Sequence, residues 1–137
     1  MATTTGNAFD TAETQAAVIR LGARYCAYVD TGDFDALVGL FGADAVFRVR
    51  DQTIQGSEAL EAFFRKAVRG IHLAGLPFVS ESGDDEVHSV QNFLFVPDGD
   101  STVTRGSYVD RIHRESGGYT FLERTVDMHP SGATASR

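Results

Sequence analysis

The second half of the sequence contains three long strand-like segments separated by two short turn sequences. The segments cover residues 86–96, 103–113 and 119–128, and each is rich in β-branched and aromatic residues. Pro97–Asp98–Gly99–Asp100 fills the first gap and Ser116–Gly117–Gly118 fills the second. Both sequences favour a tight reversal of the chain. Because consecutive strands joined by hairpin turns pair antiparallel, these residues predict an antiparallel meander.

Two helices are expected before any strand. Apolar residues recur at helical spacing from about Thr11 to Val29, and Gly32 is placed to end this helix because glycine readily adopts left-handed conformations. Asp33 is then predicted to cap a second, short helix. The buried stripe of that helix would comprise Phe34, Leu37, Leu40 and Phe41.

A short hairpin and a third helix are predicted next. Residues 45–49 and 53–55 have the pattern of short strands joined by a turn at Asp51–Gln52. Ser57 is expected to cap the helix that follows, and Glu58 in its first turn suits the positive end of the helix dipole.

Residues 71–81 are predicted to form one strand that leads into the meander. Gly75 and Pro77 should interrupt or bulge it, because neither residue fits a regular strand interior. A chain with its helices first and its strands later is typical of an α+β domain, with the helices packed on one face of the sheet.

Strict alternation divides the segment 86–96 into two faces. One face carries His88, Val90, Asn92, Leu94 and Val96, and the other carries Ser89, Gln91, Phe93 and Phe95. We take the face with His88 as the inner one. Both faces contain apolar residues, so we expect the helices to cover one and a second copy of the chain, in a homodimer or higher oligomer, to cover the other.

The length and the two ends of the chain indicate one domain. With 137 residues the chain has the size of an ordinary domain. Residues 1–10 and 129–137 are small and polar, and we expect both segments to be flexible. The folded domain is therefore predicted over residues 11–128.

Charge and composition disfavour several classes of function. A net charge of −7 argues against a nucleic-acid-binding protein and against binding to anionic membranes. No apolar run is long enough to span a bilayer, and the first residues lack the pattern of a secretory signal, so a cytoplasmic location is expected. The single cysteine, Cys26, excludes an internal disulfide and is expected to be a buried, inert thiol.

The sequence also lacks the common cofactor and metal motifs. None of the spacings HxH, HxxxH and HExxH occurs, nor does a glycine-rich phosphate loop or a GxSxG motif. We therefore expect no metal and no cofactor.

The stretch RYCAYVDTGDFDALVGLFGADAVFRV resembles the SnoaL-like branch of the nuclear-transport-factor-2-like superfamily. The helix QGSEALEAFF, the single His on the next strand and the closing SYVDRIHRESGGYTFLER fit the same pattern, so the resemblance covers residues 12–128. It implies a cone-like barrel of curved, mostly antiparallel sheet and N-terminal helices around one pocket. Members include dehydratases, isomerases, polyketide cyclases, epoxide hydrolases and proteins without catalytic activity.

Within that family, the polar pattern is most similar to scytalone dehydratase and hexachlorocyclohexane dehydrochlorinase. Both have an Asp at the end of the first helix and a His on the first long strand, which correspond to Asp30 and His72. An Arg of the dehydrochlorinase corresponds to Arg124, whereas its Lys corresponds to Tyr25. A second His of the dehydratase is replaced by Asn92. The resemblance thus implies catalytic roles for Asp30, His72, Tyr25 and Arg124.

This set implies a lyase or isomerase that acts on a small hydrophobic or aromatic molecule. His72 would be the general base, and Asp30 would fix its tautomer and stabilise the imidazolium. Arg124 could hold a leaving group or an oxyanion. We expect the substrate to contact Tyr28, Phe47, Phe64, Asn92, Leu94 and Ser107.

Simpler roles remain open for each of these residues. His72 could be an ordinary core or surface histidine, Asp30 a helix-end cap and Arg124 a partner of an acidic residue on the sheet. Tyr25 and Tyr28 could be packed aromatics. For the whole protein, the alternatives are a polyketide-cyclase-like or epoxide-hydrolase-like enzyme of natural-product metabolism and a non-catalytic module that binds a small ligand.

Overall fold

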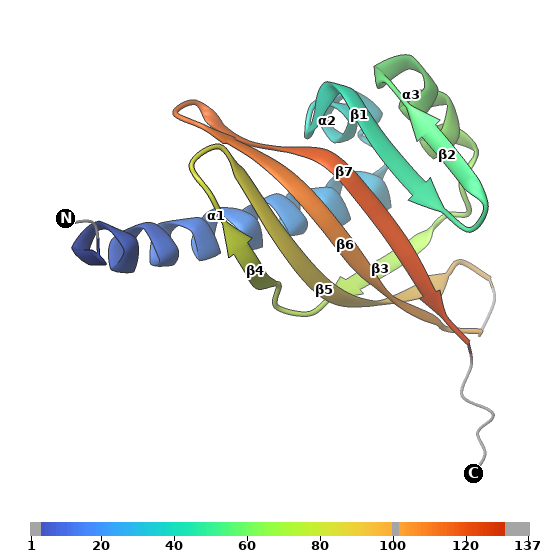
Figure 1. Ribbon diagram of the computed structural model, residues 1–137. Helices are drawn as coiled ribbons and strands as arrows, with labels where there is room; N and C mark the ends of the chain where they lie inside the picture. Colours follow the sequence, from blue (N-terminus) through green and yellow to red (C-terminus); the bar gives the residue numbers. More distant parts are fainter. Residues whose placement is uncertain (1–3, 100–101, 131–137) are drawn as a thin grey trace, which may run out of the picture.

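One long helix packs across one face of a curved sheet (Figure 1). The computed structural model describes residues 4–99 and 102–130. Helix α1 spans Thr4–Thr31 and lies behind the sheet, with its N-terminal end extending beyond the edge near β4 (Figure 1). Its buried side chains include Thr14, Val18, Leu21 and Tyr25, which recur at helical spacing along one face. This face anchors the helix to the sheet.

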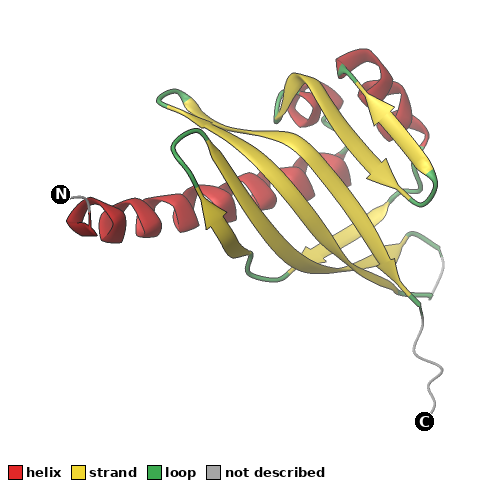
Figure 2. Cartoon of the chain, in the orientation of Figure 1, coloured by secondary structure: helices red, strands yellow, loops and turns green. Residues whose placement is uncertain are grey.

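Two shorter helices cover the other end of the same face. Helix α2 spans Phe34–Val38 and helix α3 spans Ser57–Lys66, and both lie near β1 and β2 at the end of the molecule away from the N-terminus (Figure 2). Helices therefore pack on one face of the sheet, and the predicted α+β class is confirmed.

Within the described residues the sheet has seven strands in the order β2-β1-β7-β6-β5-β3, and β4 also pairs with β5. Their bounds are β1 Phe41–Val49, β2 Gln52–Gln55, β3 Gly70–Ala74, β4 Phe78–Ser82, β5 Glu86–Pro97, β6 Thr104–Glu115 and β7 Gly118–His129. The predicted meander corresponds to β5, β6 and β7, which pair antiparallel. Strand β1 pairs parallel with β7. The expected curved, mostly antiparallel sheet with N-terminal helices is confirmed, and this sheet is open rather than closed on itself.

Several boundaries differ from the sequence-based expectations. Helix α1 begins at Thr4 rather than near Thr11, because a helix can continue past the turns that it packs against the sheet. The flexibility expected of residues 1–10 stays a prediction, and residues 1–3 and 131–137 lie outside the described part of the chain. Residues 71–81 form two strands, β3 and β4, which pair with successive parts of β5 because Gly75–Pro77 breaks the ladder.

The predicted caps are partly confirmed. Gly32 has φ 77 just after α1, and the Asp33 side chain accepts a hydrogen bond from the backbone N–H of Ala36 at 3.3 Å. Helix α2 ends at Val38, so Phe41 belongs to β1 instead of the predicted helical stripe. Gly56, with φ 91, occupies the cap position of α3, and Ser57 is already the first helical residue. A positive φ favours glycine there, which is why serine is not the cap.

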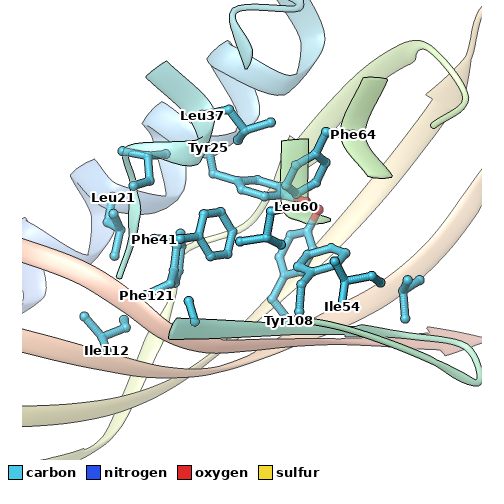
Figure 3. Packing of buried hydrophobic residues seen from close by; sticks show 14 of the residues in the cluster. Leu21, Tyr25, Leu37, Phe41, Ile54, Leu60, Phe64, Tyr108, Ile112 and Phe121 are labelled. Carbon is cyan, nitrogen blue, oxygen red and sulfur yellow. The ribbon is translucent and has the colours of Figure 1, made fainter. Parts of the chain in front are cut away.

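The core is an aromatic layer between the helices and the sheet. Figure 3 shows Tyr25 and Leu37 from the helices meeting Phe41, Tyr108 and Phe121 from the strands. The rings of Tyr25 and Tyr108 have centroids 5.6 Å apart, and those of Phe41 and Phe121 are 5.0 Å apart. Such edge-on and tilted contacts add directional packing to the burial of apolar area.

The opposite face of the sheet is the one that carries exposed apolar side chains. The exposed set comprises Ile71, Leu73, Phe78, Val90, Leu94, Val96 and Val109. Cross-strand register places them together, since Ile71 faces Val96, Leu73 faces Leu94 and Phe78 faces Val90. A row of ion pairs that includes His88, Arg111 and Glu123 borders this patch. An apolar centre with a charged border is typical of an interface.

We expect a second copy of the chain to cover this patch, since a patch that is apolar at its centre can complement itself across a two-fold axis. Leu94→Glu should convert the dimer to a monomer, because it would place a carboxylate in the centre of the interface. Sedimentation velocity at matched protein concentrations would measure the change. Ile19→Glu, at a similarly exposed apolar position on α1, is the control and should stay dimeric. A monomeric parent protein would contradict the prediction.

In the described part of the chain, no helix is long and apolar enough to cross a membrane.

Candidate active site

A cavity of about 460 Å³ opens between the helices and the inner face of the sheet. Aromatic side chains make up much of its wall, namely Tyr25, Phe47, Phe63, Phe64, Phe93, Phe95 and Tyr108. His72 of β3 borders the same cavity. A volume of this size is ordinary for a small-molecule site, and a mainly apolar wall with few polar groups is the usual composition of such a site.

Asp30 and His72 form a close pair at one side of this cavity. Asp30 lies in the last turn of α1, and its Oδ1 is 2.6 Å from Nδ1 of His72. Its Oδ2 accepts a hydrogen bond from the backbone N–H of His72 at 2.9 Å. Strand β3 pairs only with β5 among the described strands, so the backbone on its other edge is available to α1. The carboxylate therefore fixes both the ring and the strand that carries it.

This contact sets the tautomer of His72. A carboxylate can only accept a hydrogen bond, so Nδ1 carries the proton and Nε2 keeps its lone pair. Within the described residues Nε2 has no hydrogen-bond partner, and the imidazole borders the cavity. The lone pair is thus available to a molecule bound there.

The surroundings of His72 keep the imidazole neutral. Burial lowers its pKa below the ordinary value of 6.5, Asp30 partly offsets that decrease, and the nearby Arg124 cation lowers the pKa further. The net direction is downward, so the ring is unprotonated near neutral pH and can act as a base.

Arg124 is buried behind the cavity wall rather than exposed to it. Its Nε and Nη2 donate to Asp110 at 2.8 and 2.9 Å, and Nη2 also donates to Gln91 at 3.2 Å. Burial alone would lower the pKa of Arg124, but Asp110 raises it above the ordinary value, so the guanidinium is charged. Its Nη1 is buried and has no partner among the described residues. Arg124 therefore pairs with an acidic residue of the sheet, as the simpler alternative expected, and its catalytic role stays a prediction.

Two tyrosines separate this guanidinium from the cavity. The Cζ atom of Arg124 lies 3.7 Å from the ring centroid of Tyr108 and 4.4 Å from that of Tyr25, and both rings border the cavity. Burial raises the pKa of each tyrosine, so both hydroxyls stay protonated at neutral pH. Each hydroxyl can act as a neutral hydrogen-bond donor.

The structure brings some of the predicted substrate contacts together and separates others. Phe47 and Phe64 line the cavity as expected. Tyr28 packs against the core but does not line the cavity. Asn92, Leu94 and Ser107 lie on the opposite face of the sheet.

There, Ser107 Oγ donates to Asn92 Oδ1 at 3.1 Å, and a second hollow includes Asn92 and Leu94. The prediction that the face of β5 with His88 is the inner one is therefore wrong. The inner face of β5 carries Ser89 and Gln91 together with Phe93 and Phe95, because Gln91 bonds to Arg124 and to the carbonyl of Gly75. A buried cation requires polar neighbours, so apolar content does not mark the inner face of this strand.

Sequence reasoning missed Tyr108, Phe93 and Asp110. The predicted hairpin contains the signal for the first two, since strand register places Phe93 opposite Gly106, next to Tyr108. The rings of Phe93 and Tyr108 stack with centroids 4.4 Å apart. A Cβ at Gly106 would lie 2.7 Å from the Phe93 ring, so the glycine makes room for this stack.

The described residues offer few other reactive groups. Cys26 is partly buried, and burial raises its pKa, as expected for an inert thiol. Over residues 4–99 and 102–130, no group of three or more His, Cys, Asp and Glu side chains could hold a metal ion.

Comparisons with known proteins identify the family to which this fold belongs. The family model described as "SnoaL-like domain" matches residues 10–126. No curated protein matches the chain by sequence.

Several solved structures share the fold. A hexachlorocyclohexane dehydrochlorinase from Novosphingobium barchaimii has a TM-score of 0.79 and 19% identity, covering 89% of this chain and 90% of its own. A putative scytalone dehydratase from Novosphingobium aromaticivorans has a TM-score of 0.77 and 16% identity, covering 93% and 91%. A Mycobacterium tuberculosis protein of unknown function has a TM-score of 0.78 and 23% identity, covering 89% and 80%.

The pKa of His72 should lie below 6.5 and should fall further in Asp30→Asn, because the carboxylate stabilises the imidazolium. An NMR titration of the ring protons, assigned with His72→Gln, would measure both values. Asp33→Asn, which changes an exposed capping carboxylate nearby, is the control and should leave the pKa unchanged. A pKa above 6.5 in the parent protein would contradict the assignment.

The lowered pKa of His72 also makes the free energy of unfolding depend on pH. Because the folded pKa of His72 is the lower one, the unfolded chain binds the proton first as the pH falls through about 6.5. The contribution of His72 to folding stability is therefore present above that pH and is lost below it. His72→Gln should flatten this part of the pH dependence of the free energy of unfolding.

Asp110→Asn should lower the free energy of unfolding by about 3–5 kcal/mol, because it leaves the buried Arg124 charge without its counterion. Urea denaturation would measure the loss. Glu123→Gln removes a more exposed carboxylate that bonds to Arg48 and Arg111, and it should cost at most about 1 kcal/mol. Similar losses in the two variants would contradict a dominant role for the buried pair.

Proposed function

The chain belongs to the SnoaL-like domain family, and from that membership we propose that it is a cofactor-independent lyase or isomerase of small hydrophobic molecules. The observation that carries the proposal is the 2.6 Å contact between Asp30 and His72 at the wall of an apolar cavity. Neighbours named as a dehydrochlorinase and a putative dehydratase support the same class of reaction.

His72 would begin the reaction as a general base. Its Nε2 lone pair takes a proton from a carbon of the substrate, and the Asp30 carboxylate stabilises the imidazolium that forms. The electron pair of the broken C–H bond then forms a carbon–carbon double bond while a halide or hydroxyl leaves with its own pair. A departing hydroxide takes up the proton that the imidazolium returns and leaves as water. In an isomerisation the imidazolium returns the proton to another carbon.

The tyrosines and Arg124 would support the charge that develops on the substrate. Tyr25 and Tyr108 present protonated hydroxyls, which can donate to a carbonyl oxygen or to a leaving group. Arg124 lies behind their rings, so its positive charge favours an anionic intermediate without touching it. A cation fixed in an apolar environment acts more strongly than one in water.

Proton abstraction can be tested without knowing the natural substrate. The protein is incubated in D₂O with hexachlorocyclohexane and with bicyclic β-hydroxyketones, and the products are analysed by mass spectrometry. We expect loss of HCl or water, or incorporation of deuterium next to the carbonyl. His72→Gln should abolish these changes, and Asp30→Asn should slow them by about 10²–10⁴-fold.

A matched variant distinguishes a specific role of His72 from a general effect of replacing a histidine. His113→Gln changes an exposed histidine paired with Glu115 on β6 and should keep full activity. Full activity in His72→Gln would contradict the proposal. A product heavier by one water would instead favour the epoxide-hydrolase alternative, cyclised products the polyketide-cyclase alternative, and binding without any chemical change the non-catalytic module.

A further inference from the structure

The Lys, Arg, His, Asp and Glu residues that line the cavity in the described part of the chain are all basic. Apart from His72, they are Arg50 and Lys66, both of which are exposed. Among residues 4–99 and 102–130, no Asp or Glu lines the cavity, although the net charge of the protein is −7. The described lining of the cavity is thus positive on a protein that is negative as a whole.

Arg50 is held at the entrance by an uncommon backbone conformation. It lies in the turn between β1 and β2 and has φ 54, the one positive φ among the described non-glycine residues. The pairing of Val49 with Gln52 fixes the turn on both sides. A long side chain seldom adopts this conformation, so its position is set by the surrounding structure.

In the described part of the chain, neither Arg50 nor Lys66 has a carboxylate partner. Two other cations close to them in sequence do. Arg48 is 2.6 Å from Glu123, and Arg65 is 2.9 Å from Glu61. Lys66, next to Arg65 at the end of α3, forms no such pair, and Asp51, next to Arg50, forms none with it. Two unpaired cations at one opening leave a positive charge that a ligand can neutralise.

We propose that the cavity binds a hydrophobic monoanion, of which an aryl carboxylate is the simplest example. The apolar body would lie among the aromatic side chains and reach His72, and the acidic group would stay at the entrance with Arg50 and Lys66. Gln52 and Thr104 border the same cavity and supply neutral polar groups. This inference rests on the proposed function, for which it names the substrate class.

A matched pair of ligands tests the inference by binding alone. 2-Naphthoate and its neutral amide have nearly the same shape, so their dissociation constants, measured by isothermal titration calorimetry at pH 8 and low salt, differ through charge. The acid should bind at least several-fold more tightly than the amide. That preference should shrink as salt is added, because the interacting charges lie near solvent.

Variants of the two cations test whether they cause the preference for the acid over the amide. Arg50→Gln and Lys66→Gln should each weaken binding of the acid about two- to fivefold, the range of an exposed ion pair, and leave the amide unchanged. Arg48→Gln and Arg65→Gln, which remove paired cations beside them, are the controls and should change neither ligand. Equal binding of acid and amide, binding of neither, or equal losses in the controls would overturn the inference.

The two proposals can fail separately. His72→Gln should keep the preference for the acid while losing turnover, because the neutral His72 does not supply the positive charge that would attract the acid. Loss of the preference in a protein that still turns over its substrate would overturn only the substrate class. A retained preference in a protein without any activity would leave the anion site in place and contradict the lyase or isomerase.

Discussion

The buried ion pair between Arg124 and Asp110 is the interaction on which the inner face of the sheet depends. A charge that is removed from water must be paired and hydrogen-bonded, and this guanidinium achieves that through Asp110 and Gln91. The rings of Tyr25, Tyr108 and Phe121 lie over it, with centroids 3.7–4.5 Å from its Cζ. The aromatic layer of the core and the wall of the cavity are therefore organised around one cation.

Helix α1 connects this core to the candidate catalytic pair. Tyr25 and Asp30 are five residues apart, which turns their side chains by about 140° around the helix axis. Tyr25 thus faces the buried guanidinium while Asp30 reaches the free edge of β3 and holds His72. Gly32 ends the helix just beyond, and Arg69 donates to the backbone carbonyl of Asp30 at 3.1 Å. A shift of the helix would alter both contacts together.

The elements of the fold and the Asp30–His72 pair were predictable from the sequence, whereas the orientation of the faces was not. Turn residues define the meander, and the family resemblance indicates the pair. The inner face of β5 was misassigned because Gln91 and Ser89 are polar and buried, and Leu94 is apolar and exposed. Strand β7 adds a bulge at Leu122, which lets both Phe121 and Arg124 face inward despite their odd spacing. Neither effect follows from strict alternation, since both depend on contacts between distant strands.

The charges around the cavity favour a reaction in which negative charge appears. His72 is neutral before the reaction, because burial and Arg124 outweigh the stabilising effect of Asp30 on its protonated form. Once it accepts a proton, Asp30 stabilises the imidazolium, and the new negative charge lies on a substrate near Arg124 and two hydroxyls. The fixed cation therefore acts more strongly on the transition state than on an uncharged reacting carbon. That difference, rather than tight binding of the substrate, is what would lower the barrier.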